Sequence, residues 1–298
     1  MILCTMTTAG HLYRAKVMAQ SAKRHHPQAR VVVCLVEAQM HSAAASDYFD
    51  QVVLAGELGI PRFRQLVGSR NVHEASFVLK GHFLKYLLRT YPEENQFIFL
   101  DTDTLVLSAF DEIEEVLQTH AVVLTPHELF DQKKVYLFHG IFNIGFIALN
   151  RSEEAARFLE WWTARGDRYC YDRYLSGGIF FEQNWLNLAP AYFQVHILRH
   201  PGYNVAFWNF GERGRSIVRA GDGRYYANDV PIRFFHFSKL SGALVKAIKR
   251  HTLRGNRALS ILRSAYIREL NAMGRKGAAR FRWSFGKSRT GRRKAAGR

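Results

Sequence analysis

The sequence predicts an α/β domain with a mixed, mostly parallel sheet flanked by helices, followed by a basic helical C-terminal extension. Three observations predict this class. Short apolar runs alternate with amphipathic segments through the first 150 residues, some runs are apolar at nearly every position, and positive charge gathers after residue 242. Fully apolar runs are typical of strands covered on both faces. We expect a sheet domain over residues 1–242 and a basic segment over residues 243–298.

Strand and helix candidates follow one another regularly in the first half. Apolar runs predict strands at 2–7, 30–37, 51–55, 96–100 and 121–125. Apolar residues spaced three and four apart predict helices at 11–26, 74–91 and 111–120, and prolines follow the first two. This alternation is typical of parallel strands joined by crossover helices.

The second half is less regular. It predicts, in order, a loop leading into a strand at 141–150, a helix at 151–162 with Ser152 as N-cap, a short helix at 180–190 that stops near Pro190, a turn-rich aromatic loop at 199–210 and a strand at 232–238. A stripe of apolar residues then predicts an amphipathic helix in the extension, through Leu259, Leu262, Tyr266, Leu270 and Met273.

Composition limits the class of protein. The chain has 298 residues and 48% hydrophobic content, which is typical of a globular protein and not of a disordered one. We find no leader pattern and no apolar run near the roughly 20 residues that a membrane span requires. Cys4, Cys34 and Cys170 lack metal-ligand spacing and are expected to be buried free thiols. These features predict a cytoplasmic protein.

The charge is concentrated at the C-terminal end. Residues 243–298 contain 5 Lys and 12 Arg against Glu269, which gives +16 of the formal net charge of +17 and leaves +1 for residues 1–242. Phe281, Trp283 and Phe285 alternate with polar residues in this segment. The pattern predicts docking on an anionic surface, with the inner face of a membrane favoured over nucleic acid. A solubilising tail, disordered beyond Ser284, is the alternative.

Two aspartates, Asp101 and Asp103, directly follow the apolar run at 96–100. In an extended strand residues two apart point to the same side, so the two carboxylates would repel each other without a cation between them. Mg²⁺ and Mn²⁺ are commonly held by one or two carboxylates together with substrate phosphates. Because ligands of open α/β sheets bind beyond the carboxyl ends of the strands, we expect a metal site that grips a diphosphate. Alternatively, one aspartate caps a turn and the other is solvated.

Four ordered motifs carry a family resemblance: FLDTDTLVL at 99–107, FNIGFIALNRS at 142–152, FFEQNWLN at 180–187 and FFHFS at 234–238. Together they resemble GT-A fold glycosyltransferases of the family-8 type, which include glycogenin and bacterial lipooligosaccharide galactosyltransferases, and related bacterial sugar transferases. The resemblance covers most of residues 1–242. It implies transfer of a sugar from a nucleoside-diphosphate sugar, expected to be UDP-linked, to a glycan or lipid-linked glycan hydroxyl, with retention of configuration weakly favoured.

The resemblance also implies roles for individual residues. Mn²⁺ or Mg²⁺ would be held by Asp101, Asp103 and His236, while Gln183 and Glu182 would act at the donor sugar. The expected donor-binding residues are Thr7, Tyr13, Lys80, Thr102, Asn143, Gly145 and Lys239.

Some positions depart from the family or remain open. Glu182 stands where the family usually has Asp, and Lys239 stands where it often has glycine. The phosphate-binding lysine is Lys239 or Lys246, and Lys85 is an alternative to Lys80. Each tryptophan considered could stack on a sugar or belong to the core, namely Trp161, Trp162 and Trp208.

Two other functions fit parts of the sequence. The D-x-D-x-T string also resembles the first motif of haloacid-dehalogenase-type phosphatases, in which Asp101 would be the nucleophile and residues 221–229 the late acidic motif. The position of the string, about a hundred residues into the chain, disfavours that interpretation. A non-catalytic protein that binds anionic surfaces is the other alternative.

Overall fold

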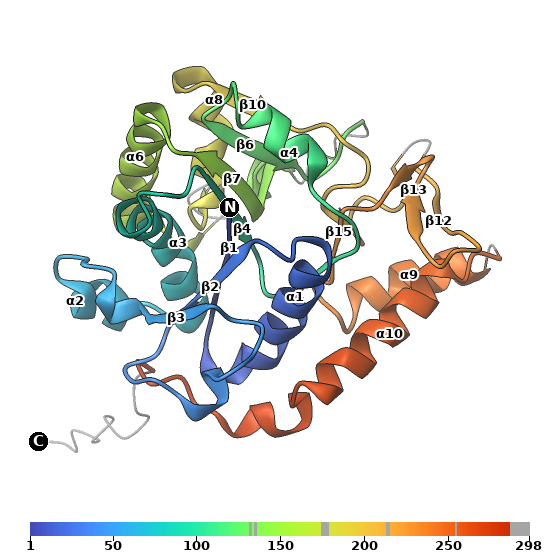
Figure 1. Cartoon of the computed structure of the whole chain (residues 1–298), viewed down its shortest axis with the longest axis horizontal. Coiled ribbons are helices and arrows are strands. Elements are labelled where there is room, and N and C mark those ends of the chain that lie inside the picture. The colour runs from blue at the N-terminus through green and yellow to red at the C-terminus, as the bar shows by residue number, and fades with distance from the viewer. Residues whose placement is uncertain (131–132, 134–135, 174–178, 213–214, 254, 287–298) are drawn as a thin grey trace, which may run out of the picture.

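The computed structural model describes residues 1–298 apart from 131–132, 134–135, 174–178, 213–214, 254 and 287–298. At its centre lies a seven-stranded sheet of order β10-β6-β7-β4-β1-β2-β3 (Figure 1). The strands are β1 (Ile2–Thr7), β2 (Arg30–Leu35), β3 (Gln51–Leu54), β4 (Gln96–Leu100), β6 (Val122–Pro126), β7 (Phe142–Asn150) and β10 (Val195–Ile197). In this sheet β7 runs antiparallel to both of its neighbours, and the other pairs are parallel. The predicted mixed, mostly parallel sheet is confirmed.

Helices cover both faces of the sheet. Helices α3 (Val72–Thr90) and α6 (Glu153–Tyr169) contribute to one core cluster, and α1 (Leu12–His25) and α4 (Asp111–Val116) contribute to the other. Successive strand residues point to opposite faces. In β4, for example, Phe97 and Phe99 join the first cluster, while Ile98 and Leu100 join the second. This is why β4 is apolar at every position after Gln96.

Helix ends follow the local sequence at α6 and depart from it at residues 180–192. Ser152 caps α6 as predicted, because its Oγ accepts the Ala155 N–H at 3.1 Å. The expected short helix at 180–190 is corrected to a 3-10 helix, η4 (Gln183–Leu188), followed by α8 (Ala189–Tyr192). Pro190 lies in the first turn of α8 and does not end a helix, since a proline there gives up no helical hydrogen bond. The segment at 141–150 is almost entirely the strand β7.

A second sheet brings a distant strand to the two aspartates. Its order is β11 (Val205–Ala206), β15 (Phe234–His236) and β5 (Thr104–Val106). Asp101 and Asp103 lie in the turn between β4 and β5, not in an extended strand as expected, and Thr104 donates its N–H to the Asp101 carbonyl at 3.1 Å. In the β15–β5 ladder His236 stands opposite Thr104, and the Phe237 N–H donates to the Asp103 carbonyl at 2.7 Å.

The other elements are short or belong to the extension. The helices are α2 (Phe63–Gly68), α5 (Tyr136–His139), α9 (Ala243–Leu253), α10 (Ala258–Ala272), η1 (Ala9–His11), η2 (Ser42–Ala44), η3 (Ala55–Glu57) and η5 (Arg275–Arg280). The strands are β8 (Asp172–Arg173), β9 (Ile179–Phe180), β12 (Ile217–Arg219), β13 (Tyr225–Ala227) and β14 (Val230–Pro231). None of the helices described is both long and apolar enough to cross a bilayer.

The C-terminal extension packs against the sheet domain. Leu259, Leu262 and Leu270 of the predicted stripe are buried in one cluster with residues of α1 and β5. Tyr266 stacks on Phe237, with ring centroids 3.8 Å apart. The boundary at residue 243 stays a prediction, and across it the extension and the domain share a hydrophobic cluster.

The three aromatic residues assigned to a lipid surface contact the protein instead. Phe281, Trp283 and Phe285 are partly buried, and they pack beside His41, the end of β2 and Phe63. The expectation of disorder beyond Ser284 concerns mainly residues 287–298, which lie outside the described residues.

Candidate metal centre

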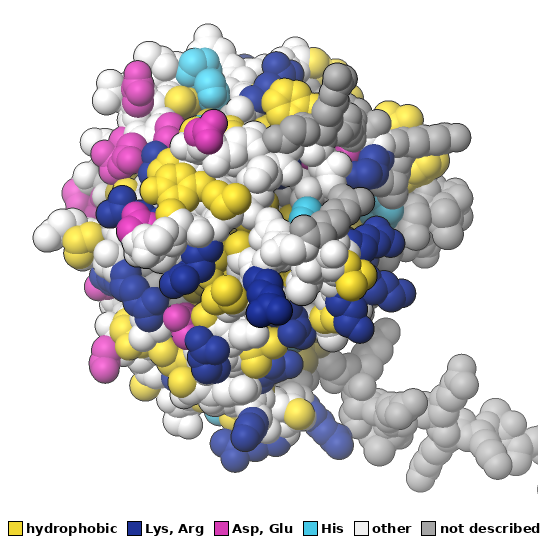
Figure 2. Space-filling model, turned by 90° about the vertical axis from the view of Figure 1, so that its right-hand side faces the viewer, with side chains coloured by type: hydrophobic (Ala, Val, Ile, Leu, Met, Phe, Trp, Pro, Cys, Tyr) yellow, Lys and Arg dark blue, Asp and Glu magenta, His cyan; other side chains and the backbone are white. Residues whose placement is uncertain are grey.

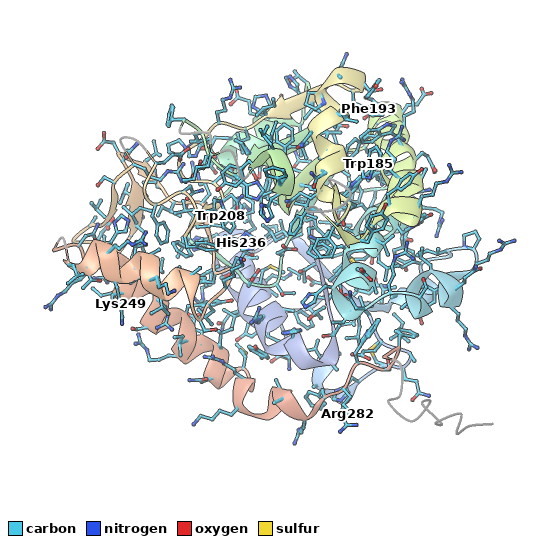
Figure 3. All side chains as sticks on the ribbon, turned by 180° about the vertical axis from the view of Figure 1, so that it is seen from behind. Trp185, Phe193, Trp208, His236, Lys249 and Arg282 are labelled. Carbon is cyan, nitrogen blue, oxygen red and sulfur yellow. The ribbon has the colours of Figure 1, made fainter. Side chains whose placement is uncertain are left out.

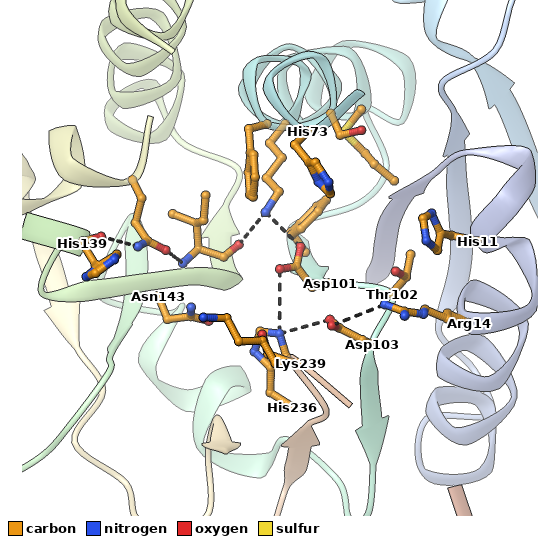
Figure 4. Close-up of a pocket in the computed structure, with 18 of the residues that line it drawn as sticks. His11, Arg14, His73, Asp101, Thr102, Asp103, His139, Asn143, His236 and Lys239 are labelled. Carbon is orange, nitrogen blue, oxygen red and sulfur yellow. Dashed lines mark hydrogen bonds and ion pairs between the residues drawn. The ribbon is translucent and has the colours of Figure 1, made fainter. Parts of the chain in front are cut away.

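Three side chains converge where β4 and β15 end. The His236 Nε2 atom lies 3.1 Å from Asp103 Oδ1 and 4.0 Å from Asp101 Oδ2 (Figure 4). One ligand atom from each residue lies within 4.8 Å of the other two. Two carboxylate oxygens and an imidazole nitrogen suit a divalent ion such as Mn²⁺ or Mg²⁺.

The second oxygen of each carboxylate faces a cation of the protein. Lys80 Nζ lies 2.9 Å from Asp101 Oδ1, and Arg14 Nη1 lies 3.7 Å from Asp103 Oδ2. Lys80 is 3% exposed and also donates to the Ile144 carbonyl at 3.1 Å. These cations offset the repulsion between the aspartates and leave Asp101 Oδ2 and Asp103 Oδ1 turned toward His236.

Two further residues fix the imidazole of His236. Its Nδ1 lies 3.1 Å from the buried Asn204 Oδ1, so an N–H at Nδ1 leaves Nε2 facing the aspartates. Such orienting hydrogen bonds are common behind metal-binding histidines. Gly145 makes room for the ring, because a Cβ at that position would lie 2.5 Å from His236 Cε1. The arrangement therefore fits a metal ligand better than a core histidine.

The pKa values follow from these contacts. Burial by itself would raise the pKa of Asp103, but His236 and Arg14 favour the carboxylate more strongly and hold its pKa at about 2. Burial disfavours the imidazolium of His236, yet Asp103 and Asp101 raise its pKa above the usual value. Asp103 is therefore ionised at neutral pH, as a metal ligand requires.

A pocket of about 610 Å³ opens beside these residues. Nine of the predicted site residues line it, namely Thr7, Lys80, Asp101, Thr102, Asp103, Asn143, Gln183, His236 and Lys239. Of the three tryptophans considered, Trp208 lines the pocket, with its ring centroid 5.2 Å from that of His236 (Figure 3). Trp161 and Trp162 pack in the core around α6.

Of the two pairs of alternative lysines, one member of each lines the pocket. Lys239 is exposed at the pocket, whereas Lys246 is exposed on α9 and does not line it. Lys239 has a φ of 51°, a left-handed conformation that glycine adopts more readily than lysine. Lys80 lines the pocket, while Lys85 pairs with Glu160 at the surface, at 2.6 Å.

The two residues expected to act at the donor sugar differ in position. Gln183 lines the pocket, but its Oε1 accepts the Ile144 N–H at 3.1 Å and its Nε2 donates to the His139 carbonyl. Glu182 is 2% exposed and does not line the pocket. One of its oxygens lies 3.3 Å from Cys170 Sγ, and the other has no hydrogen-bond partner in the described part of the chain. Burial raises the pKa of Glu182 to about 7.

Two other expected donor residues lie beside the pocket and not in its lining. The Tyr13 hydroxyl accepts a hydrogen bond from Arg14 Nε at 3.2 Å, and the ring packs with the cluster under α10. Gly145 acts on His236 as described above, and its carbonyl accepts the Asp101 N–H at 2.8 Å.

Sequence reasoning missed several residues of the site. Arg14, His11 and His73 come from helix segments on one side of the pocket, and His127 and Tyr136 stack on the other with ring centroids 4.8 Å apart. Helical periodicity does not reveal which polar residues face a pocket. The sequence gives little indication of Asn204. In the structure it lies in the turn-rich aromatic loop with a φ of 50°, a conformation that asparagine adopts more readily than most residues.

Comparisons with known proteins agree with the fold. No protein-family model matches the chain. Two uncharacterized proteins of Bacillus subtilis (strain 168) are similar in sequence. YfnD is 24% identical over 239 residues, covering 78% of this chain and 76% of YfnD, and YfnF is 24% identical over 258 residues, covering 83% and 84%.

One solved structure identifies the fold of this chain. The galactosyltransferase LgtC, in complex with donor and acceptor sugar analogs, superposes with a TM-score of 0.50 and 14% sequence identity. The match covers 80% of this chain and 87% of LgtC. The chain therefore has the GT-A glycosyltransferase fold, as the four motifs led us to expect.

Proposed function

We propose that this GT-A chain is a metal-dependent glycosyltransferase that moves a sugar from a nucleoside-diphosphate sugar to a hydroxyl of a glycan or glycolipid. The observation that carries the proposal is the convergence of Asp101, Asp103 and His236 on the wall of a pocket at the carboxyl ends of the strands. LgtC, which has the same fold, has been solved with donor and acceptor sugar analogs.

The metal would sit against the donor's diphosphate. Asp101, Asp103 and His236 would hold Mn²⁺ or Mg²⁺, and the bound ion would stabilise the charge that develops on the leaving nucleoside diphosphate. The exposed ammonium group of Lys239 lines the same pocket and would pair with a phosphate. Lys80 and Arg14 would hold the aspartates in this orientation before the donor arrives.

The two ends of the pocket suggest where the parts of the donor lie. Thr7 ends β1, and Thr8 and His11 follow it. These residues would receive the nucleoside, for which uridine is our expectation. Tyr136, Trp208 and the His127–Asn143 pair, whose nitrogens are 3.2 Å apart, line the other end and would contact the sugars.

The role of Gln183 bears on stereochemistry. With both ends of its side-chain amide bonded to backbone, Gln183 would shape the wall beside the anomeric carbon and would have to release a bond before contacting it. Retention of configuration therefore stays a proposal that rests on the family resemblance. Sugar hydroxyl binding by Glu182 also stays a prediction, and it would require this buried carboxylate to reach the pocket.

The experiment is a screen of nucleotide sugars with and without Mn²⁺, read by thermal shift and by donor hydrolysis. We expect Mn²⁺-dependent stabilisation and slow hydrolysis with one UDP-sugar. Release of phosphate from monoesters would favour the phosphatase alternative, and neither activity would favour the non-catalytic one. Residues 221–229 fall in the β12–β13 region and do not line the pocket, which removes the second motif that a phosphatase needs.

We propose that α9 and α10 dock on an anionic membrane and so bring the enzyme close to a lipid-linked acceptor. Lys and Arg side chains gather with apolar ones on this side of the molecule (Figure 2). Leu253 and Ile261 are 87% and 46% exposed there. The exposed basic residues of this surface are Lys246, Lys249, Arg250, Arg257, Arg268 and Lys276. Basic charge with exposed apolar residues fits lipid headgroups.

Vesicles that contain phosphatidylserine test this docking. Replacing Lys246, Lys249 and Arg250 together by glutamine should weaken binding about a hundredfold, since each charge near the surface contributes about 1 kcal/mol. A matched triple replacement of exposed Arg64, Arg157 and Arg168, on α2 and α6, should change binding much less. Equal losses in the two variants would indicate a general charge effect and contradict a specific docking face.

A further inference from the structure

The strap, which we define as residues 281–285, crosses the carboxyl end of β2. The Trp283 Nε1–H donates to the Val36 carbonyl at 2.9 Å. The Ser284 N–H donates to Glu37 Oε2 at 2.8 Å, and the Ala38 N–H donates to Ser284 Oγ at 2.7 Å. The strap is thus held by hydrogen bonds to three consecutive residues that follow β2.

Glu37 connects the strap to the loop after β1. Its side chain is buried, with 5% exposure, and its second oxygen, Oε1, accepts the Ala9 N–H at 3.0 Å. Ala9 lies between Thr8 and His11, both of which line the pocket. One carboxylate therefore joins the C-terminal strap to the wall of the pocket where we place the nucleoside.

Apolar contacts support the same connection. Phe281 packs with Ala9 and Leu12 and lies edge-on to His41, with ring centroids 4.4 Å apart. The Phe281 carbonyl would lie 3.7 Å from a Cβ on Gly10. At the other end of the strap Phe285 contacts Phe63 of α2, with ring centroids 5.6 Å apart. The strap thus reaches from the loop after β1 to α2.

We propose that Glu37 and the strap are positioning elements of the donor site, which hold residues 7–11 in the conformation that receives the nucleoside. The inference rests on the proposed function. Loops at strand ends are the mobile parts of such folds. Here the buried carboxylate of Glu37 holds the loop, because its two oxygens accept hydrogen bonds from Ala9 and from Ser284. Gln cannot reproduce this, because one side of its amide is a donor.

The experiment compares full-length Glu37→Gln, Ser284→Ala and Trp283→Ala with wild type. Calorimetric titration with UDP and Mn²⁺ gives nucleotide affinity, and amide hydrogen exchange reports on residues 8–12. We expect UDP binding about tenfold weaker for Glu37→Gln and Trp283→Ala. Exchange at residues 8–12 should be faster in both variants, whereas exchange in β4 should be unchanged. Ser284→Ala should have a smaller effect, because its backbone N–H still reaches Glu37.

Two exposed residues supply the controls. Arg282→Gln changes the charge of the strap, and Asp229→Asn removes an acidic group elsewhere. Figure 3 shows Arg282 at the outer edge of the molecule. Both control variants should bind UDP within twofold of wild type. In a transfer assay the strap variants should raise the KM for the donor and leave the KM for the acceptor unchanged.

The outcomes separate the two proposals. Faster exchange with unchanged UDP affinity would show a purely structural strap and overturn its role in donor binding. If amide exchange at residues 8–12 is unchanged in the strap variants, the strap does not hold this loop and the proposal is contradicted. If wild-type protein binds no nucleoside diphosphate with Mn²⁺, the proposed function fails and the strap's donor role fails with it, whereas a strap failure alone leaves wild-type binding intact.

Discussion

The metal centre contains a half-buried carboxylate, Asp103, and the segment behind the pocket wall contains a buried one, Glu182, and the charge of the two differs. Asp103 lies beside His236 and Arg14, and its pKa is held at about 2. Glu182 lies against Cys170, and burial raises its pKa to about 7 although Lys80 acts in the other direction. Desolvation raises the pKa of both carboxylates, so the adjacent cation decides which one is ionised. The comparison explains why one region suits a metal and the other does not.

The strongest test of this comparison is Asp103→Asn, which keeps the shape of the side chain and removes its charge. We expect the affinity for Mn²⁺ to fall at least about a hundredfold, because an amide is a poor ligand beside Asp101 and His236. Thermal shift with UDP and Mn²⁺ provides the measurement. The exposed Asp222→Asn is the control and should retain the full shift. A shift that survives in Asp103→Asn would remove Asp103 from the metal site.

Lys80→Met tests how much the ion pair between Lys80 and Asp101 contributes to stability. In EDTA we expect a loss of about 3 kcal/mol in the free energy of unfolding, since the variant breaks an ion pair whose cation is buried. Added Mn²⁺ should restore part of this loss. Lys85→Met removes a lysine from the same helix, but its pair with Glu160 is at the surface, so the loss should stay below about 1 kcal/mol. Similar losses for both lysines, measured by urea unfolding, would contradict the comparison.

Glu182→Gln tests the other side of the comparison through pH. The folded pKa of Glu182, about 7, lies above its ordinary value of 4.5, so folded wild-type protein binds the extra proton between these values and loses stability as pH rises. The variant should gain up to about 3 kcal/mol over wild type above pH 7 and little near pH 4. Urea unfolding at pH 5 and pH 8 measures this difference. A gain that is independent of pH would mean that Glu182 is already ionised, like Asp103.

Gly145→Ala has the smallest expected effect on stability and sharpens the geometry of the metal centre. The new Cβ would lie 2.5 Å from His236 Cε1 and 2.7 Å from Asn143 Oδ1, so the imidazole must move. We expect a loss of about 1–3 kcal/mol by thermal or urea unfolding, together with weaker Mn²⁺ binding. Gly68→Ala, where a Cβ would meet nothing within 4 Å, should be neutral or slightly stabilising. Normal metal binding by Gly145→Ala would show that His236 is not held in place by this contact.

Much of the fold could be predicted because its signals are local. The strands β1, β2 and β4 are mostly apolar, and α1 and α3 show their periodicity within a few turns. Errors arose where tertiary contacts override local pattern. Pro190 lies in the first turn of a short helix and does not end one as the sequence predicts, and residues 101–103 turn between two strands of different sheets.

The amino-acid sequence by itself determined the sheet, the helices that cover it and the two aspartates at a strand end, because each depends on residues close together in the chain. The tertiary structure alone decided which side chains meet. His236 reaches Asp103 through the β15–β5 ladder, more than a hundred residues along the chain, while Glu182 faces Cys170. Charge state and ligand geometry depend on neighbours in space, and no periodicity along the chain encodes these neighbours.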